Sequence, residues 1–307
     1  MNVFIVGASG YIGNAVALEF LNNGHDVVGL CNSDISEKQL KSQNIKAVKG
    51  DMADSSSWKQ YAEKADVIIH AAHLRPGMRL SSSWLRRSQE LRDKCLLSLV
   101  NIARSNPGIK AIIYTSGMIA HGNHGEKIID ESTLPTASAL GNYHREGERI
   151  MNEAANTGLP AMSIRPGMVY GNGGTFKKFF LDVAAKGKYQ FPGDGENYIP
   201  FIHIHDLAKA YVAAVDVAST NRLINVVDDQ PIKMSEMAAS LLNCFGGGKH
   251  SSVPSWLVSL FAGRALSEML VGSYRVKNEH ARKVLDWEPQ YGSFRSGISH
   301  VVADYQR

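Results

Sequence analysis

Three glycines near the start of the chain have a spacing that suits phosphate binding. Gly7 to Gly13 reads Gly-Ala-Ser-Gly-Tyr-Ile-Gly and directly follows the short apolar run Val3–Val6. Glycine permits a tight strand-to-helix turn, and the free N–H groups of the following helix attract a pyrophosphate. The pattern therefore predicts a dinucleotide-binding loop. The residues that we expect to contact the dinucleotide here are Gly7, Ser9, Gly10, Tyr11, Ile12 and Gly13.

Short apolar runs alternate with helical stretches along the first half of the chain. The predicted strands are Val3–Val6, Asp26–Leu30, Ile45–Val48, Asp66–His70, Ala111–Thr115 and Ala161–Arg165. The clearest helical patterns are Ile12–Leu21, Trp84–Arg104 and Tyr143–Asn156. Such alternation predicts an α/β fold, a Rossmann-type doubly wound parallel sheet with crossover helices on both faces.

The rhythm changes after Pro166, where glycine and proline interrupt the pattern. A helix at Asp206–Val217, a strand at Leu223–Val227 and a helix at Met234–Cys244 follow. We therefore expect a dinucleotide-binding Rossmann domain over residues 1–165 and a smaller, mainly substrate-binding region over residues 166–307, packed over the ligand edge of the sheet. Since no linker-like segment separates them, the two parts should share one core.

Composition excludes several classes of protein. The chain has 307 residues, 44% of them hydrophobic and 20% charged, and its formal net charge is +4. This mild charge argues against nucleic acid or an acidic membrane as partner. Three distant cysteines, Cys31, Cys95 and Cys244, form no disulfide framework and no metal-binding pair. No apolar run reaches the ~18–20 residues that span a bilayer, and no basic leader precedes Val3. We expect a cytoplasmic protein with no metal.

Five further segments show a family pattern together with the glycine loop. They are Gly50–Asp54, Asp66–Ala72, Arg165–Gly171, Phe201–Ala208 and Val284–Pro289. Over nearly the whole chain they resemble the short-chain dehydrogenases/reductases, especially the extended branch of nucleotide-sugar epimerases, dehydratases and reductases. The resemblance implies an enzyme that uses NAD or NADP. It also implies further cofactor contacts at Asp51, Met52, Ala71, Ala72, Thr115, Tyr143, Pro166 and Gly167.

The end of the second predicted strand bears on the choice of dinucleotide. An acidic side chain there would bind the adenosine ribose and favour NAD. In this chain the strand ends in Cys31, Asn32 and Ser33, and Cys31 stands where extended members that use NAD commonly have Asp. Asn32 and Ser33 could donate hydrogen bonds to a 2′-phosphate. We therefore predict a preference for NADP, with NAD as the alternative.

The resemblance also implies a catalytic tyrosine and lysine four residues apart, with a serine or threonine after the fifth strand. Tyr143 lies in the tyrosine position, but the lysine position is Gly147. Counting back from Gly122 places the hydroxyl position on Gly117, next to Ser116. His144 and Arg145 follow Tyr143 directly and are not expected to share its helix face.

Other residues could complete such a site. Histidine titrates near neutral pH and can donate a proton, so His73 after the fourth strand and His121 after the fifth are candidates. Our candidate catalytic set is Tyr143, Ser116 and His73. Arg75 and Arg79 are candidates for binding an anionic substrate.

These observations favour an NAD(P)-dependent oxidoreductase acting on a small carbonyl or alcohol. Two alternatives stay open: an epimerase, dehydratase or isomerase acting on a sugar-like or secondary-metabolite substrate, and a non-catalytic dinucleotide-binding regulator. The resemblance further implies a homodimer through the helices Trp84–Arg104 and Tyr143–Asn156, the first of which is rich in leucine.

Overall fold

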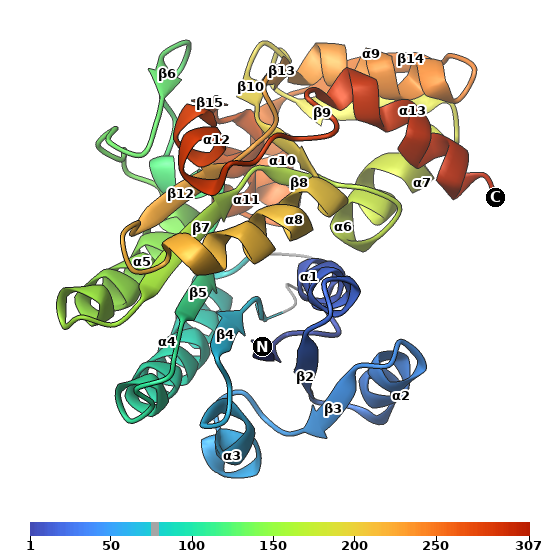
Figure 1. Ribbon diagram of the computed structural model, residues 1–307. Helices are drawn as coiled ribbons and strands as arrows, with labels where there is room; N and C mark the ends of the chain where they lie inside the picture. The colour runs from blue at the N-terminus through green and yellow to red at the C-terminus, as the bar shows by residue number, and fades with distance from the viewer. Residues whose placement is uncertain (75–79) are drawn as a thin grey trace.

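A seven-stranded parallel sheet forms the centre of the computed structural model, which describes residues 1–74 and 80–307 (Figure 1). Arg75 and Arg79 lie outside the described residues. The order across the sheet is β12-β7-β5-β4-β1-β2-β3. The strands are β1 (Asn2–Val6), β2 (Asp26–Cys31), β3 (Lys46–Lys49), β4 (Val67–His70), β5 (Ala111–Thr115), β7 (Ala161–Pro166) and β12 (Leu223–Val226).

Helices cover both faces of the sheet because successive side chains of each strand point to opposite sides. Val3 and Ile5 of β1 belong to one core cluster, whereas Phe4 and Val6 belong to another. The first cluster is closed by α1 (Tyr11–Asn22), α2 (Asp34–Ser42), α8 (Ile204–Ala214) and α12 (Glu279–Leu285). The second is closed by α3 (Lys59–Ala62), α4 (Ser82–Arg104) and α5 (Ala139–Asn156). The predicted doubly wound fold is confirmed.

A smaller region packs at one end of the sheet and occupies the upper half of Figure 1. Its own core contains Phe176, Phe201, Leu241 and Phe294. Its helices are α6 (Gly174–Phe176), α7 (Asp182–Ala184), α9 (Met234–Cys244), α10 (Ser255–Ala262), α11 (Arg264–Val271) and α13 (Phe294–Tyr305). Its paired strands are β8 (Met168–Tyr170) with β11 (Phe201–His203), β9 (Lys188–Pro192) with β14 (Lys249–Val253), β10 (Tyr198–Ile199) with β13 (Ile232–Lys233), and β6 (Ile128–Ile129) with β15 (Arg275–Val276).

The two halves of the chain are joined through the main sheet. The segment Leu223–Val227, expected in the smaller region, instead supplies β12, which pairs with β7 as the edge strand of the large sheet. Leu207, Ile224 and Trp287 lie in the same core cluster as Val3. Because β12 lies beyond residue 165, a cut there would divide the sheet, and the domain boundary itself stays a prediction.

Helix α4 buries most of its apolar residues inside the chain. Leu96, Leu99, Val100 and Ile102 lie in the core beneath it, while Leu97 is 51% exposed. Most of the apolar side chains that suggested a dimer surface on this helix are thus buried in the chain's own core. Among the described helices, none is long and apolar enough to cross a membrane.

The sheet order places a crevice at the carboxyl ends of β1 and β4. These strands are neighbours, yet the chain leaves β1 toward β2 on one side and β4 toward β5 on the other. Open α/β sheets bind ligands at such a reversal point. Gly7 follows β1 and Ala71 follows β4, so both predicted cofactor segments lie at this crevice.

Candidate active site

The predicted phosphate loop requires glycine at its two ends. Gly7 has φ +90°, and a Cβ there would lie 2.7 Å from the backbone nitrogen of Ala72. A Cβ on Gly13 would lie 2.2 Å from the carbonyl oxygen of Gly7. Gly10 is the N-cap of α1, and no side chain caps this helix. The loop therefore leaves the first N–H groups of α1 to an anion, as a bound pyrophosphate requires.

Tyr11 is held by a second glycine-rich segment, which comes from the smaller region. Its hydroxyl is buried and has no hydrogen-bond partner among the residues that the structure describes. A Cβ on Gly171, Gly173 or Gly174 would come within 2.7 Å of the Tyr11 side chain. Ser9 and Ile12 stay partly exposed beside it. The glycine cradle and the uncapped helix together fit a dinucleotide at this edge of the sheet.

The residues after β2 show how the adenosine end is built. The Cys31 thiol is buried and donates to the carbonyl oxygen of Val48 at 3.5 Å. Ser33 is the N-cap of α2, where its hydroxyl accepts from the N–H of Ser36. Asn32 is exposed, and the carboxylate of Asp34 is paired with Lys49 at 2.5 Å. The second strand thus ends without an unpaired carboxylate.

Asp51 and Met52, which the resemblance places beside adenine, form the turn after β3. The carboxylate of Asp51 accepts from the N–H of Ala53 at 2.9 Å, and its carbonyl oxygen accepts from the indole N–H of Trp58 at 2.9 Å. Met52 remains partly exposed. Trp58 therefore fixes this turn, and the adenine contacts stay a prediction.

Tyr143 is the centre of a polar cluster that joins three elements. It is 5% exposed on α5. Its hydroxyl lies 3.2 Å from Nδ1 of His73, which follows β4, and 3.4 Å from the hydroxyl of Ser88 on α4. Burial raises the pKa of Tyr143, whereas Ser88 and the charge of Arg92 oppose that rise. The phenol is therefore protonated at neutral pH and can act as a proton donor.

His73 lies beside Tyr143 as a neutral imidazole. Desolvation lowers its pKa, and the positive charge of Arg92 adds to the decrease. His73 is exposed to solvent. The structure therefore brings together two of the three predicted catalytic residues, Tyr143 and His73, in direct contact.

His144 also belongs to this cluster, contrary to the expectation from helix faces. Its ring centroid lies 5.1 Å from that of Tyr143 and 5.7 Å from that of His73. A Cβ on Gly117 would lie 3.3 Å from Cε1 of His144. The imidazole thus fills the space next to the position where the family carries its hydroxyl. Residue spacing along the helix predicted that His144 would not lie beside Tyr143. Spacing gives the direction of each Cβ but not how far the imidazole ring extends from the backbone.

The lysine position is closed to any side chain. Gly147 is buried on α5, and a Cβ there would lie 2.6 Å from ring carbons of Tyr114 and 2.7 Å from its hydroxyl. Tyr114 lies on β5 and is fully buried. Glycine at this position therefore lets α5 pack against the Tyr114 ring.

Ser116, the third predicted catalytic residue, is directed away from Tyr143. It is 4% exposed and donates to Glu148 at 2.5 Å. Glu148 also binds Arg165 through two hydrogen bonds of 2.7 and 2.6 Å. His121 lies beside Arg165, fully buried, with Nε2 3.0 Å from Oδ1 of Asn225. Burial and Arg165 lower the pKa of His121 to about 4, so this network is an internal one and the catalytic role of Ser116 stays a prediction.

Three residues predicted from the resemblance to contact the cofactor have structural partners. The Thr115 hydroxyl is buried and lies 2.6 Å from the hydroxyl of Tyr211 on α8. Pro166 ends β7, and a Cβ on Gly167 would lie 2.7 Å from the carbonyl oxygen of Pro200. The cofactor contacts at Thr115, Pro166 and Gly167 stay predictions.

Comparison with known proteins agrees with this geometry. Residues 3–226 match the model of the NAD dependent epimerase/dehydratase family. The chain belongs to this family. It is accordingly an NAD(P)-dependent enzyme, as the loop predicted. A human epimerase family protein, SDR39U1, solved with NADPH, has the same fold, with a TM-score of 0.83, 18% identity, and coverage of 99% of this chain and 100% of that one.

Two curated relatives of this family member are reductases. The 3-diazoavenalumate denitrifying reductase of a Streptomyces species is 25% identical over 97% of this chain and 99% of its own length. The 2-alkyl-3-oxoalkanoate reductase of Shewanella oneidensis is 23% identical over 92% of this chain and 75% of its own length. These identities support the family and its coarse chemistry and leave the substrate open.

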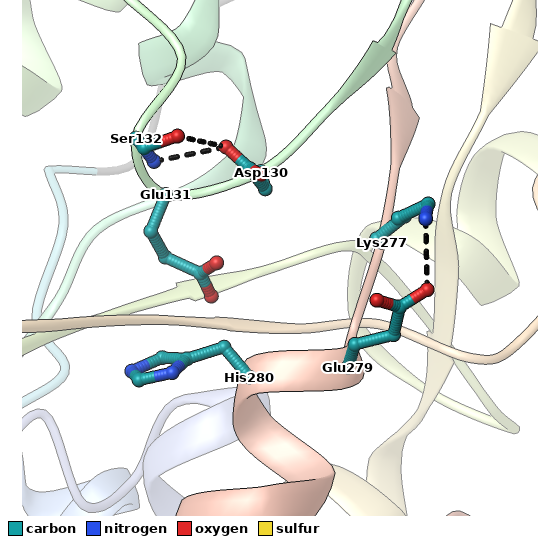
Figure 2. A pocket seen from close by; sticks show the side chains of 6 residues that line it. All are labelled: Asp130, Glu131, Ser132, Lys277, Glu279 and His280. Carbon is teal, nitrogen blue, oxygen red and sulfur yellow. Dashed lines mark hydrogen bonds and ion pairs between the residues drawn. The ribbon is translucent and has the colours of Figure 1, made fainter.

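A separate hollow of about 330 Å³ lies between β6, β15 and the start of α12. Figure 2 shows its charged residues gathered around it, with Asp130 bound to Ser132 and Lys277 bound to Glu279. Glu131 accepts from the backbone N–H of Asn225 at 2.7 Å. Lys277 and Glu279 pair with each other, whereas Asp130 and Glu131 bind a serine hydroxyl and a backbone N–H. In the part of the chain that the structure describes, no group of His, Cys, Asp and Glu is arranged to hold a metal.

Proposed function

We propose that this family member is an NADPH-dependent reductase of a small carbonyl compound and that Tyr143 donates the proton. The observation that carries the proposal is the buried phenol of Tyr143, held between His73 and Ser88 near the crevice that contains the phosphate loop. The raised pKa of Tyr143 favours the reductive direction, because only a protonated phenol can donate.

The bound nicotinamide would supply the hydride, and the protein would supply the proton. Reduction then needs a proton on the carbonyl oxygen as negative charge develops there. Tyr143 gives up its phenolic proton, and His73, 3.2 Å away at Nδ1, is placed to return one. A neutral imidazole can give a proton to Tyr143 and take one up from solvent, since one ring nitrogen donates while the other accepts. The exposed side of His73 gives access to solvent protons.

His144 is our candidate for orienting the carbonyl oxygen. It occupies the space beside Gly117, where the family usually carries a serine or threonine hydroxyl. Burial and the neighbouring His73 lower its pKa well below the usual value, so the imidazole is neutral and carries one N–H donor. Its Nδ1 has no hydrogen-bond partner within residues 1–74 and 80–307. A hydrogen bond from His144 would therefore take over the role that we assigned to Ser116.

The substrate should have an apolar portion. Met118 follows Gly117 directly and packs with Ile119, Leu140 and Val227. Leu85 and Met269 lie partly buried against the same cluster. Apolar side chains with a few polar groups are typical of small-molecule sites. The alkyl chain named in the Shewanella relative's substrate supports the same class.

The preference for NADP rests on the end of β2. Cys31 is buried, and the Asp34 carboxylate is paired with Lys49, so neither presents an unpaired carboxylate to a 2′-phosphate. Asn32 is exposed and able to donate to that phosphate. The NADPH in the human SDR39U1 structure supports this preference.

Purified protein should oxidise NADPH in the presence of small aliphatic or aromatic carbonyls. The loss of nicotinamide absorbance measures this oxidation. Tyr143→Phe should lower the rate by ~10²–10⁴-fold, the usual cost of losing a general acid. Tyr189→Phe is the matched control, since Tyr189 is a buried tyrosine on β9. The wild-type rate should be level across neutral pH and fall only in the alkaline range, where the phenol ionises. A Tyr143→Phe rate within about threefold of wild type would refute the proposed acid.

The alternatives have different outcomes in the same assay. An epimerase, dehydratase or isomerase would change its substrate with no net change in nicotinamide absorbance. A regulator would bind the dinucleotide and turn over no substrate. We also propose, from the sequence, a homodimer in the cytoplasm, which light scattering and localisation of the tagged protein would test.

A further inference from the structure

A phenol that transfers protons works best with a cation nearby, and this protein lacks the usual one. In the resembling family a lysine four residues after the tyrosine supplies the charge. Here that position is Gly147, where the Tyr114 ring lies 2.6 Å from the place a Cβ would take. The Tyr114 ring therefore occupies the space that a lysine side chain would need. A positive charge near Tyr143 has to come from another element.

Arg92 of α4 contacts Tyr143 of the neighbouring helix α5. Its guanidinium carbon lies 4.4 Å from the centroid of the Tyr143 ring, within the distance of a cation–π contact. It also donates through NH1 to the backbone carbonyl oxygen of Tyr143. Arg92 is 1% exposed. One buried guanidinium thus contacts both the ring and the backbone of the proposed acid.

We propose that Arg92 is the positioning residue for Tyr143 and supplies the positive charge that a lysine at Gly147 would otherwise supply. This inference rests on the proposed function of Tyr143. The charge of Arg92 stabilises the phenolate that remains after proton donation, and its two contacts fix the ring. Removing a buried cation so close to an acid should raise the pKa of the acid by about one unit or more.

Among the described residues, the groups that contact Tyr143 besides Arg92 do not carry this charge. His73 and His144 have lowered pKa values and are neutral at pH 7. Tyr114, on β5, is a buried phenol whose pKa is raised by desolvation. The carboxylate of Asp93 binds Arg92, at 2.8 Å from Nε and 2.5 Å from Nη2. Asp93 raises the pKa of Tyr143, opposite to Arg92.

Arg92 differs from the family's lysine in its role toward the cofactor: we do not expect it to hold the nicotinamide ribose. The lysine also holds the nicotinamide ribose, whereas Arg92 is buried behind Tyr143 and committed to Asp93 and the Tyr143 carbonyl. Cofactor holding and charge supply are therefore separated in this protein. A change at Arg92 should lower kcat and leave the KM for NADPH nearly unchanged.

The test measures the titration of Tyr143 itself. A fluorinated tyrosine, which ionises at lower pH, is incorporated at position 143 of the full chain and titrated by ¹⁹F NMR. Arg92→Met keeps the length and burial of the side chain but removes the charge, so the pKa of residue 143 should rise by about one unit or more. Arg92→Lys keeps the charge and should restore part of the shift.

Asp93→Asn is the control of opposite sign. Removing this carboxylate leaves Arg92 unneutralised, so the pKa of residue 143 should fall. A purely structural role for Arg92 would move both variants in the same direction or not at all. If Arg92→Met does not fold, Asp93→Asn and Arg92→Lys still decide. An unchanged pKa in either Arg92→Met or Asp93→Asn would overturn the proposal.

The titration is independent of turnover. If no carbonyl is reduced, the proposed function fails while the pKa shifts still report on Arg92. If Tyr143→Phe abolishes reduction but the two charge variants leave the titration unchanged, the proposed function stands and the role of Arg92 is refuted.

Discussion

Glycine serves different purposes in the phosphate loop and in the catalytic cluster. In the loop, Gly7 and Gly13 bring backbone against backbone, and they leave a helix end open to an anion. In the cluster, Gly117 and Gly147 make room for the rings of His144 and Tyr114. We propose that the first pair serves a ligand, whereas the second makes room for side chains of the protein.

The difference changes how the missing catalytic residues are interpreted. A glycine at the lysine or hydroxyl position first suggests lost chemistry. Here a neighbouring ring fills each space, and His144 and Arg92 bring polar groups to the same phenol from other directions. The departures from the family pattern therefore describe a rearranged site rather than an empty one.

The largest expected effect lies in the phosphate loop. Gly10→Glu should weaken NADPH binding by about 100-fold or more, equivalent to about 2.8 kcal/mol, because a carboxylate would lie at the N-terminus that binds the pyrophosphate. Gly10→Ala is the control. A Cβ there lies 3.1 Å from the carbonyl oxygen of Gly7, so a small shift accommodates it. Calorimetry that finds equal affinity in wild type and Gly10→Glu would contradict a ligand-serving loop.

A smaller effect is expected where glycine serves packing. Gly147→Ala should destabilise the protein by about 1–3 kcal/mol, the usual cost of overpacking, because its methyl group overlaps the Tyr114 ring. Denaturant unfolding measures this change. Gly108→Ala, whose Cβ would lie 3.3 Å from the side-chain oxygen of Asn106, should stay within about 0.5 kcal/mol.

A double variant tests whether the overlap is the cause. Tyr114→Leu removes the ring, so combining it with Gly147→Ala should cost less than the sum of the two single changes. Strictly additive values would show that Gly147 is required for another reason.

The smallest effect concerns the choice of dinucleotide. Cys31→Asp should shift the NADP-to-NAD preference by about tenfold toward NAD, about 1.4 kcal/mol, since a carboxylate at the end of β2 binds the ribose hydroxyls and repels a 2′-phosphate. Titration of both cofactors into wild type and variant measures it. Tighter NAD binding by the wild type would show that this strand end does not select NADP.

The sheet could be predicted from sequence because its signals are local. Each strand of the first half is a short apolar run, and β5 begins and ends where the pattern placed it. The place of Leu223–Val226 could not be predicted, because a strand's neighbours are decided by packing. The sequence predicts neither α10 nor α11, because each is only eight residues long and the two meet directly at Gly263.

The sequence by itself determined the fold, the phosphate loop and the position of Tyr143, because each depends on consecutive residues within one strand–turn–helix unit or one helix. Only the tertiary structure decided what surrounds Tyr143. His73, Ser88, Arg92 and Tyr143 are separated by up to 70 positions in the chain, and Ser116 points to Glu148 rather than to the phenol. Side-chain direction and the space left by two glycines set these contacts, and neither can be read from spacing along one helix.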